Sequence, residues 1–88
     1  MKASNQFILR KIAQEQLLIP VGEAAIQVRG LIALSESGGL LFEKLQGGCT
    51  REDLIRTLTA EYDVSEETAA EDTDAFLDQM RQLKILEE

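Results

Sequence analysis

The sequence has no histidine, no tryptophan, one cysteine, one proline and only four aromatic residues among its 88 positions. Without histidine, histidine-based acid–base catalysis and the usual His/Cys zinc sites are excluded. Cys49 has no partner within the chain, so an internal disulfide is excluded and a reducing compartment is favoured. No apolar run approaches the roughly 18–20 residues that cross a bilayer, and the N-terminus lacks the apolar region of a signal peptide. We therefore expect a cytoplasmic protein without membrane association, metal or cofactor.

Negative charge dominates and is unevenly distributed. The formal net charge is −7, of which residues 1–34 contribute +2 and residues 35–88 contribute −9. The length and the apolar share of 44% predict a single globular domain over residues 1–88. The charge asymmetry indicates that the two parts face different partners, although the acidic part is also typical of a solvated helix surface.

The first third of the chain predicts β-strands. Residues Gln6–Ile12 are rich in β-branched and aromatic side chains, and the polar Ala13–Gln16 segment is short enough for a hairpin connection. Leu17–Ile19 is a short apolar run that Pro20 closes, because proline cannot donate to a strand ladder. Apolar side chains alternate along Ile26–Leu34, which predicts a longer third strand.

From Ser35 onward the apolar period becomes helical. Ser35 is a typical N-cap, and the helix that follows it is expected to end at Gly47 and the glycine after it. A second helix is predicted to begin at Thr50. A third covers Ser65–Leu83, where apolar residues form one continuous stripe and acidic residues favour the positive end of the helix dipole.

Together these elements predict an α+β domain, a three-stranded antiparallel sheet followed by three helices that cover one sheet face. The strand Ile26–Leu34 would lie at an edge of that sheet, and a long edge invites pairing with another chain. An extended peptide can add to such an edge through main-chain hydrogen bonds, with the Ser65–Leu83 helix as the second wall of the groove. The simpler alternative is that the chain's own termini cover the edge.

The sequence offers little catalytic chemistry. Cys49 lies in a loop that leads into a helix, where the helix N-terminus can lower a thiol pKa, but no base neighbours it in the sequence. The last predicted helix carries a run of carboxylates that could bind a hard cation, but the segment lacks the glycine at which calcium-binding loops turn. Such a run is more typical of a solvated helix face. The carboxylates are Glu66, Glu67, Glu71, Asp72, Asp74 and Asp78.

Two other classes of binding protein remain as alternatives. A carrier-type domain is modified on a serine at the start of a helix, and Ser37 is the candidate, but glycines follow it where such domains place leucine. A winged-helix nucleic-acid-binding domain needs a recognition helix that neutralises phosphates. The Ser65–Leu83 helix would be the recognition helix, but it carries six acidic side chains and one basic residue, Arg81. Because phosphates would repel such a helix, we expect no nucleic acid partner.

The segment Gly30–Gly38 (GLIALSESG) resembles the G-x-I-x-L-N-E-x-G signature of the PqqD family, the peptide chaperones of pyrroloquinoline quinone biosynthesis and related leader-recognition domains. Ser35 stands where the family usually has asparagine, and both residues cap helices well. Five further segments resemble the family in order and spacing. They are Phe7–Arg10, Ile19–Gly22, Thr50–Leu54, Glu61–Val64 and Phe76–Leu77.

The resemblance implies a winged helix-turn-helix-like domain without enzymatic activity. Members of the family bind the leader of a ribosomally synthesised precursor peptide and present it to a modifying enzyme, often a radical SAM (S-adenosylmethionine) enzyme. The expected partners are therefore the precursor peptide and a radical SAM maturation enzyme. Because exposed edge strands also pair with each other, we expect a monomer or a weak homodimer.

In the family the leader adds a strand to the third strand and packs against the third helix. Carried onto this sequence, the main-chain contacts fall on Gln27, Val28, Arg29, Gly30, Leu31 and Ile32. The helix wall would come from Asp72, Phe76, Gln79 and Leu83. Gly30 would let another backbone approach closely, and Arg29 would pair with an acidic leader residue. Phe76 and Leu83 have a ready alternative as core residues, and periodicity does not decide which flank of the helix faces the groove.

Overall fold

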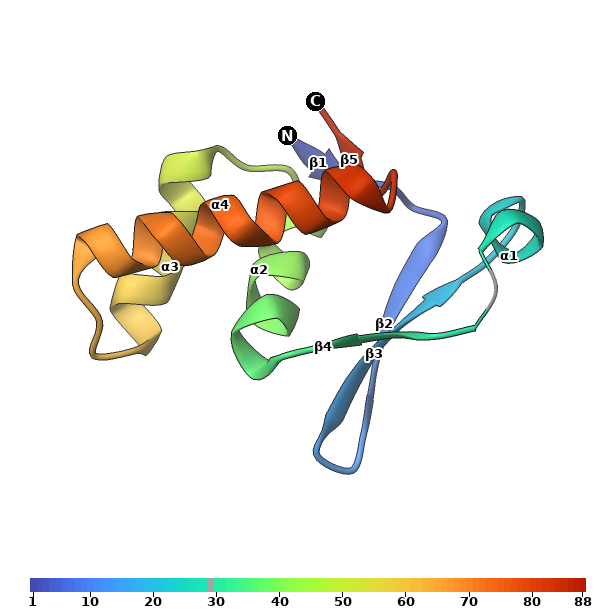
Figure 1. Ribbon diagram of the computed structural model, residues 1–88, viewed down its shortest axis with the longest axis horizontal. Helices are drawn as coiled ribbons and strands as arrows, with labels where there is room; N and C mark the ends of the chain where they lie inside the picture. The colour runs from blue at the N-terminus through green and yellow to red at the C-terminus, as the bar shows by residue number, and fades with distance from the viewer. Residues whose placement is uncertain (29) are drawn as a thin grey trace.

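In the computed structural model, which describes residues 1–28 and 30–88, a small sheet lies beside a group of helices (Figure 1). The sheet consists of β2 (Phe7–Ile12), β3 (Glu15–Pro20) and β4 (Ile32–Leu34), in the order β2-β3-β4. Both neighbouring pairs are antiparallel, and a two-residue turn, Ala13–Gln14, joins β2 to β3. The predicted α+β class and the edge position of the third strand are confirmed.

The register of the sheet decides which strand residues enter the core. Leu18 of β3 is paired with Leu9 on one side and with Ile32 on the other, so these three side chains share one face. Leu18 is fully buried, and Leu9 and Ile32 are half-buried against the same core. This face of the sheet lies toward the helices.

The third strand is much shorter than the predicted Ile26–Leu34. Residues Ala24–Gln27 form a short helix, α1, and the N–H of its first residue donates to Oε1 of Gln6 at 2.8 Å. Gly30 has a φ of +88°, a left-handed conformation that interrupts a strand. The alternating apolar pattern therefore gives a wrong prediction for this segment. Ile26 is 81% exposed, and the hydrogen bond between Ala24 and Gln6, which are 18 residues apart in the sequence, stabilises the helix.

Three longer helices follow the sheet: α2 (Glu36–Gln46), α3 (Arg51–Glu61) and α4 (Glu66–Gln82). Each begins one residue after a predicted capping residue. These N-caps are Ser35, Thr50 and Ser65. Each cap hydroxyl accepts a hydrogen bond from the backbone N–H three residues later, at 3.0 or 3.1 Å. A cap of this kind stabilises a helix by about 1 kcal/mol, so the three helix starts are encoded locally.

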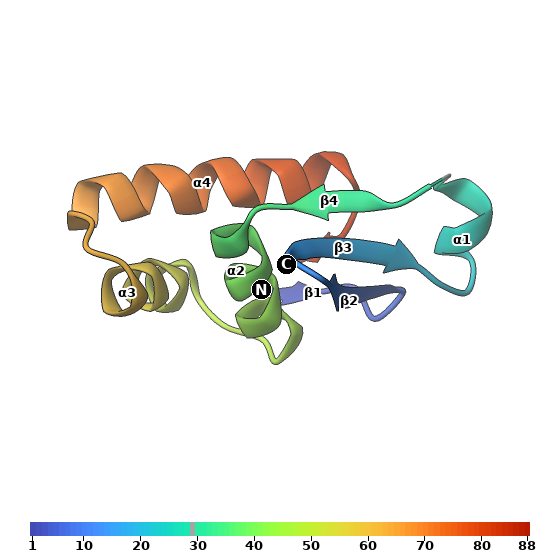
Figure 2. The ribbon, with the colours of Figure 1, turned by 90° about the horizontal axis from the view of Figure 1, so that it is seen from below.

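α2 connects the sheet to the other helices. It contacts all three strands of the sheet, whereas α3 packs against both α2 and α4 (Figure 2). Phe42 and Leu45 of α2 are fully buried, together with Leu54 of α3 and Met80 of α4. The predicted apolar stripe of the last helix is thus the face that enters the core.

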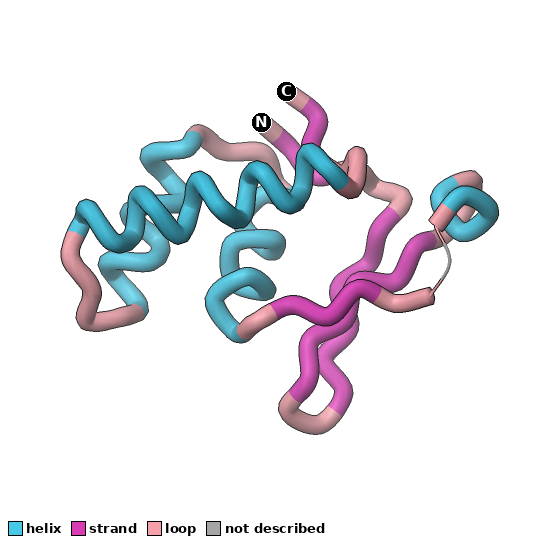
Figure 3. Tube along the Cα trace, in the orientation of Figure 1, coloured by secondary structure: helices cyan, strands magenta, loops and turns pink. Residues whose placement is uncertain are grey.

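A second, two-stranded sheet joins β1 (Lys2–Ala3) to β5 (Leu86–Glu87), which brings both ends of the described chain together (Figure 3). Ala3 is 3% exposed and Ile85, which directly precedes β5, is fully buried. Neither strand is predicted from the sequence, because each has only two residues and forms only through pairing with the other. This pairing occurs away from β4, and among the described residues no strand pairs with the outer edge of the larger sheet.

Candidate peptide-binding site

The outer edge of β4 faces a cleft whose opposite wall is α4. Within residues 1–28 and 30–88, no strand pairs with this edge, because β4 ends the order β2-β3-β4. α4 runs alongside β4 on the side away from β3 (Figure 2). The cleft has a volume of about 440 Å³. Its two walls are formed by Ala33 and Leu34 of β4 and by Asp72, Ala75, Phe76 and Gln79 of α4.

A second hollow of about 410 Å³ lies near the C-terminal end of α4, beside α1. Gln27 and Val28 line it on one side, and Leu83 lines it on the other. Phe7 of β2 and Ala24 of α1 also contribute to its wall. Together, the cleft and this hollow follow α4 from its middle to its end.

The structure brings most of the predicted helix wall together. Asp72, Phe76 and Gln79 all line the cleft opposite β4. The flank of α4 that carries these three residues therefore faces the edge of β4. Leu83 lies apart from them in the second hollow. Phe76 is only 6% exposed, so it is a core residue and a cleft residue at once, and Leu83 is half-buried.

The predicted strand residues are arranged differently from the expectation. The backbone N–H of Gln27 donates to Glu23 O at 3.3 Å, and that of Val28 donates to Ala24 O at 2.8 Å. These two donors are therefore used inside the chain and are not free edge donors. Arg29 lies outside the described residues. Gly30 is exposed, Leu31 is 58% exposed, and only Ile32 belongs to β4.

Seven residues that line the cleft are missing from the sequence-based prediction of the site. They are Ala33, Leu34, Ser35, Ser37, Gly38, Leu41 and Ala75. Ala75 lies three residues after Asp72 and four before Gln79, so helical periodicity places all three on one flank of α4. That signal was sufficient to find Ala75. Ala33 and Leu34 belong to the predicted edge strand Ile26–Leu34, but the family resemblance placed the contacts on its earlier residues, most of which lie outside β4.

Ion pairs neutralise part of the acidic surface on α4. Asp74 accepts two hydrogen bonds from the Arg51 guanidinium, at 2.7 and 3.0 Å, and these bonds hold the pKa of the Asp74 carboxyl below its usual value. Arg81 donates to Asp78 at 3.2 Å and to Glu88 at 3.0 Å. The carboxylates and the thiol of the described residues form no group of three or more that could hold a metal ion.

Cys49 is not an activated thiol. Burial raises its pKa above the usual value, and the nearby Asp53 carboxylate raises it further. The positive charges of the Met1 ammonium and of Lys44 lower the pKa, but they do not offset these two effects. The thiolate that would act as a nucleophile is disfavoured at neutral pH.

None of the helices in the described part of the chain is both long and apolar enough to span a bilayer. Ser37, the residue considered for a carrier-type domain, lies in the first turn of α2, where it is half-buried and its Oγ is 3.3 Å from that of Ser35.

The fold resembles that of a solved structure, TbiB1 in complex with the TbiA(beta) leader peptide. The TM-score is 0.78, the two sequences are 24% identical, and the match covers 99% of this chain and 95% of that chain. With a three-stranded antiparallel sheet followed by helices, this is a winged helix-turn-helix-like α+β domain.

The profile of the family described as coenzyme PQQ synthesis protein D (PqqD) matches residues 9–86. The chain therefore belongs to the PqqD family, as its motifs indicate. A comparison with functionally curated proteins finds none that matches.

Proposed function

We propose that this protein binds the leader of a ribosomally synthesised precursor peptide by strand addition at β4 and presents it to a modifying enzyme, without catalysing a reaction itself. The observation that carries the proposal is the outer edge of β4, which pairs with no strand of the described residues and faces a cleft with α4 as its second wall. Membership of the PqqD family and a fold similar to that of TbiB1 with its leader peptide support it.

The geometry of β4 suits the addition of a strand. Its outer edge presents backbone N–H and C=O groups, and an added strand lies about 4.8 Å away. Such a strand would occupy the cleft, with alternate side chains directed toward Phe76 and toward solvent. Main-chain hydrogen bonds would provide affinity, and the α4 residues would provide side-chain selectivity.

The proposed main-chain contacts lie on residues 31–34, later in the chain than the segment Gln27–Ile32. The N–H groups of Gln27 and Val28 are already hydrogen-bonded within α1 and its cap. The side chains of Gln27, Val28 and Leu83 line the second hollow, so we propose that they contact the part of the leader that extends beyond β4.

An amide NMR titration with the leader peptide encoded beside the gene tests this proposal. We expect chemical-shift changes at residues 31–34 and on the cleft flank of α4, at Asp72, Ala75 and Gln79. Ala75→Trp should fill the cleft and weaken binding by at least tenfold, because Ala75 is exposed and lines it. Glu71→Trp, an equally bulky change at another exposed α4 position, is the control. Saturating peptide without shifts in either region would contradict strand addition.

We further propose that the partner enzyme is a radical SAM maturation enzyme that docks a basic surface on the acidic outer flank of α4. Glu67 and Glu71 are exposed on this helix, and the molecule as a whole carries −7. Opposite charges steer association, and salt screens them. We expect the affinity for the enzyme to fall as ionic strength rises from 50 to 500 mM, whereas a salt-independent affinity would contradict this docking surface.

A further inference from the structure

A separate cavity of about 350 Å³ adjoins the cleft between β4 and α4 beyond the end of β4. Ser35, Ser37 and Asp72 line both spaces, so the two lie side by side at the first turn of α2. A peptide added along β4 would therefore reach this cavity directly after the strand ends.

The floor of the cavity is apolar. Leu58 is 2% exposed, and Tyr62 and Val64 are half-buried beside it. Leu58 belongs to α3, while Tyr62 and Val64 come from the connection between α3 and α4. This floor would accommodate the hydrocarbon part of a side chain.

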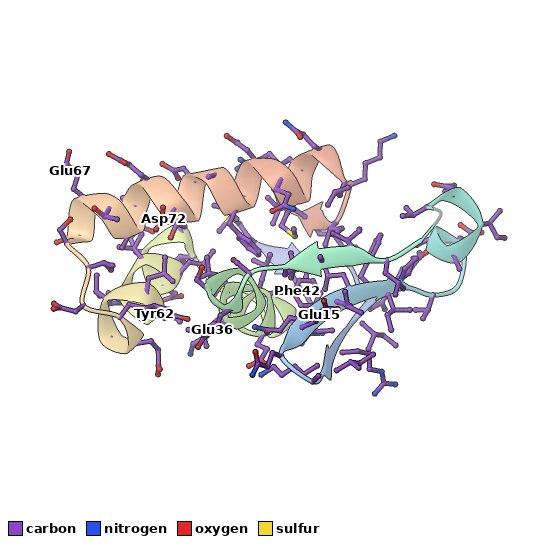
Figure 4. All side chains as sticks on the ribbon, turned by 60° about the horizontal axis from the view of Figure 1, so that its bottom comes forward. Glu15, Glu36, Phe42, Tyr62, Glu67 and Asp72 are labelled. Carbon is purple, nitrogen blue, oxygen red and sulfur yellow. The ribbon has the colours of Figure 1, made fainter. Side chains whose placement is uncertain are left out.

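The rim of the cavity carries two carboxylates that come from different elements. Glu36 is the first residue of α2 and Asp72 lies on α4, and both side chains are exposed (Figure 4). The ion pairs of the described residues involve neither of them, and no cationic side chain lines the cavity. Burial raises the pKa of the Tyr62 phenol, and the negative charges of Glu36 and Glu61 raise it further, as expected for a negative local potential.

We infer that this cavity is a specificity pocket for a lysine or arginine side chain of the leader, located just beyond the segment that pairs with β4. The inference rests on the proposed function and names the chemistry that the site selects. The aliphatic stem would lie on Leu58 and Val64, and the cation would lie between Glu36 and Asp72. The Tyr62 ring adds a surface on which a cation is attracted by the π-system.

The test is a set of affinity measurements with the leader peptide encoded beside the gene. Each lysine or arginine of the peptide is replaced in turn by norleucine, which keeps an aliphatic stem and removes the charge. We expect one replacement to weaken binding about twofold to fivefold, which corresponds to the loss of one exposed ion pair.

The same replacement should have no effect on a Glu36→Gln, Asp72→Asn double variant, because the partner charges are already absent. Glu67→Gln is the control, since its carboxylate projects from α4 away from the cavity (Figure 4). Glu67→Gln should keep the full sensitivity to the replacement. The peptide variants leave the protein unchanged, so a loss of affinity in them does not reflect misfolding.

Two outcomes separate this inference from the proposed function. If the leader binds at β4 and every norleucine peptide keeps its affinity, the cationic pocket is wrong and the strand addition stands. If the leader does not bind, the proposed function fails, and hexylammonium is compared with hexanol as a probe of the cavity by amide shifts. Shifts at residues 35–37 and 62–64 that only the ammonium produces would support the pocket, and equal or absent shifts would overturn it.

Discussion

At the scale of single residues, Asp53 is the helix-capping carboxylate whose pKa is shifted most strongly. It accepts hydrogen bonds from the Thr50 backbone N–H at 3.0 Å and from the Arg56 guanidinium at 2.7 Å. The Thr50 hydroxyl in turn accepts from the Asp53 N–H, which completes a capping box. These hydrogen bonds lower the pKa of Asp53 from 3.8 to about 2, with the Thr50 backbone as the largest cause.

This lowered pKa predicts a loss of stability in acid. Because the folded-state pKa of Asp53 lies below its unfolded value, its contribution is complete above pH 3.8 and is lost as the pH falls toward 2. Asp53→Asn should therefore reduce the decline in unfolding free energy between pH 4 and pH 2, measured by urea unfolding. Thr50→Ser, which keeps the cap, should retain the decline. An unchanged slope in Asp53→Asn would contradict the assignment.

Gly39 is a second residue whose role only its surroundings explain. It is buried in the first half of α2, and a Cβ at this position would overlap the side-chain amide of Gln16 on β3. Inside a helix, glycine costs about 1 kcal/mol relative to alanine, so the helix alone favours alanine at position 39. The close contact with Gln16 on β3 has the opposite effect and favours glycine there.

A double-mutant cycle separates these two effects. In a Gln16→Ala background, Gly39→Ala should raise the unfolding free energy by about 1 kcal/mol, because the overlap is gone and the helix preference remains. In the wild-type background the gain should be smaller, because the Gln16 side chain must first move. Equal gains in both backgrounds, measured by urea unfolding, would show that Gln16 is no constraint.

At the scale of elements, the candidate site depends on how β4 begins and ends. α1 and Gly30 delay the start of the strand to Ile32, and the Ser35 cap ends it after Leu34. Three residues are short for an edge strand, and a short edge limits unwanted association with other chains. The same three residues are still sufficient to orient an incoming strand along α4.

Proline substitutions test this edge directly. Successive backbone N–H groups of a strand point to opposite sides, so Leu31 and Ala33 share one direction and Ile32 and Leu34 share the other. Proline removes one donor, so Leu31→Pro and Ile32→Pro should differ. The variant that removes a bond to β3 should be destabilised. The other should stay folded and lose leader affinity about fivefold or more, measured by NMR or anisotropy. If every proline variant that folds binds the leader like the wild type, strand addition at β4 is wrong.

At the scale of the whole molecule, the pairing of β1 with β5 fixes the position of the C-terminal end of α4. The Ser4 N–H donates to the Ile85 carbonyl at 2.7 Å, and the Ile85 N–H donates to Met80 O at 2.8 Å. Ile85 is fully buried although it lies outside every helix. The position of α4, and with it one wall of the cleft, therefore depends on contacts between the two ends of the described chain.

We predict that Ile85→Ala lowers the unfolding free energy by about 2–5 kcal/mol, the usual cost of removing a large buried side chain. A domain of this size has only about 5–10 kcal/mol in total, so the urea midpoint should fall markedly. Ile26→Ala is the matched control, since Ile26 is 81% exposed and the change should stay within about 0.5 kcal/mol. Similar midpoints for both variants would contradict the structural role of the buried Ile85 side chain at the end of α4.

Local chemistry in the sequence was sufficient to predict the three long helices and the first hairpin. Ser35, Thr50 and Ser65 cap their helices through hydrogen bonds that span three residues, and such signals are readable in the chain itself. The apolar stripe of α4 likewise predicts its buried face, whereas Asp72, Phe76 and Gln79 were expected in the groove only because of the resemblance to the PqqD family.

Only the tertiary structure decided the length of β4, the existence of α1 and the pairing of β1 with β5. The Gln6 side chain that caps α1 and the partner of each terminal strand lie far away in the sequence, so no local pattern encodes them. The same holds for the cleft, whose two walls, β4 and α4, are about 40 residues apart and meet because α2 and α3 hold them. The periodicity of a chain states which residues share a face, and packing determines what that face meets.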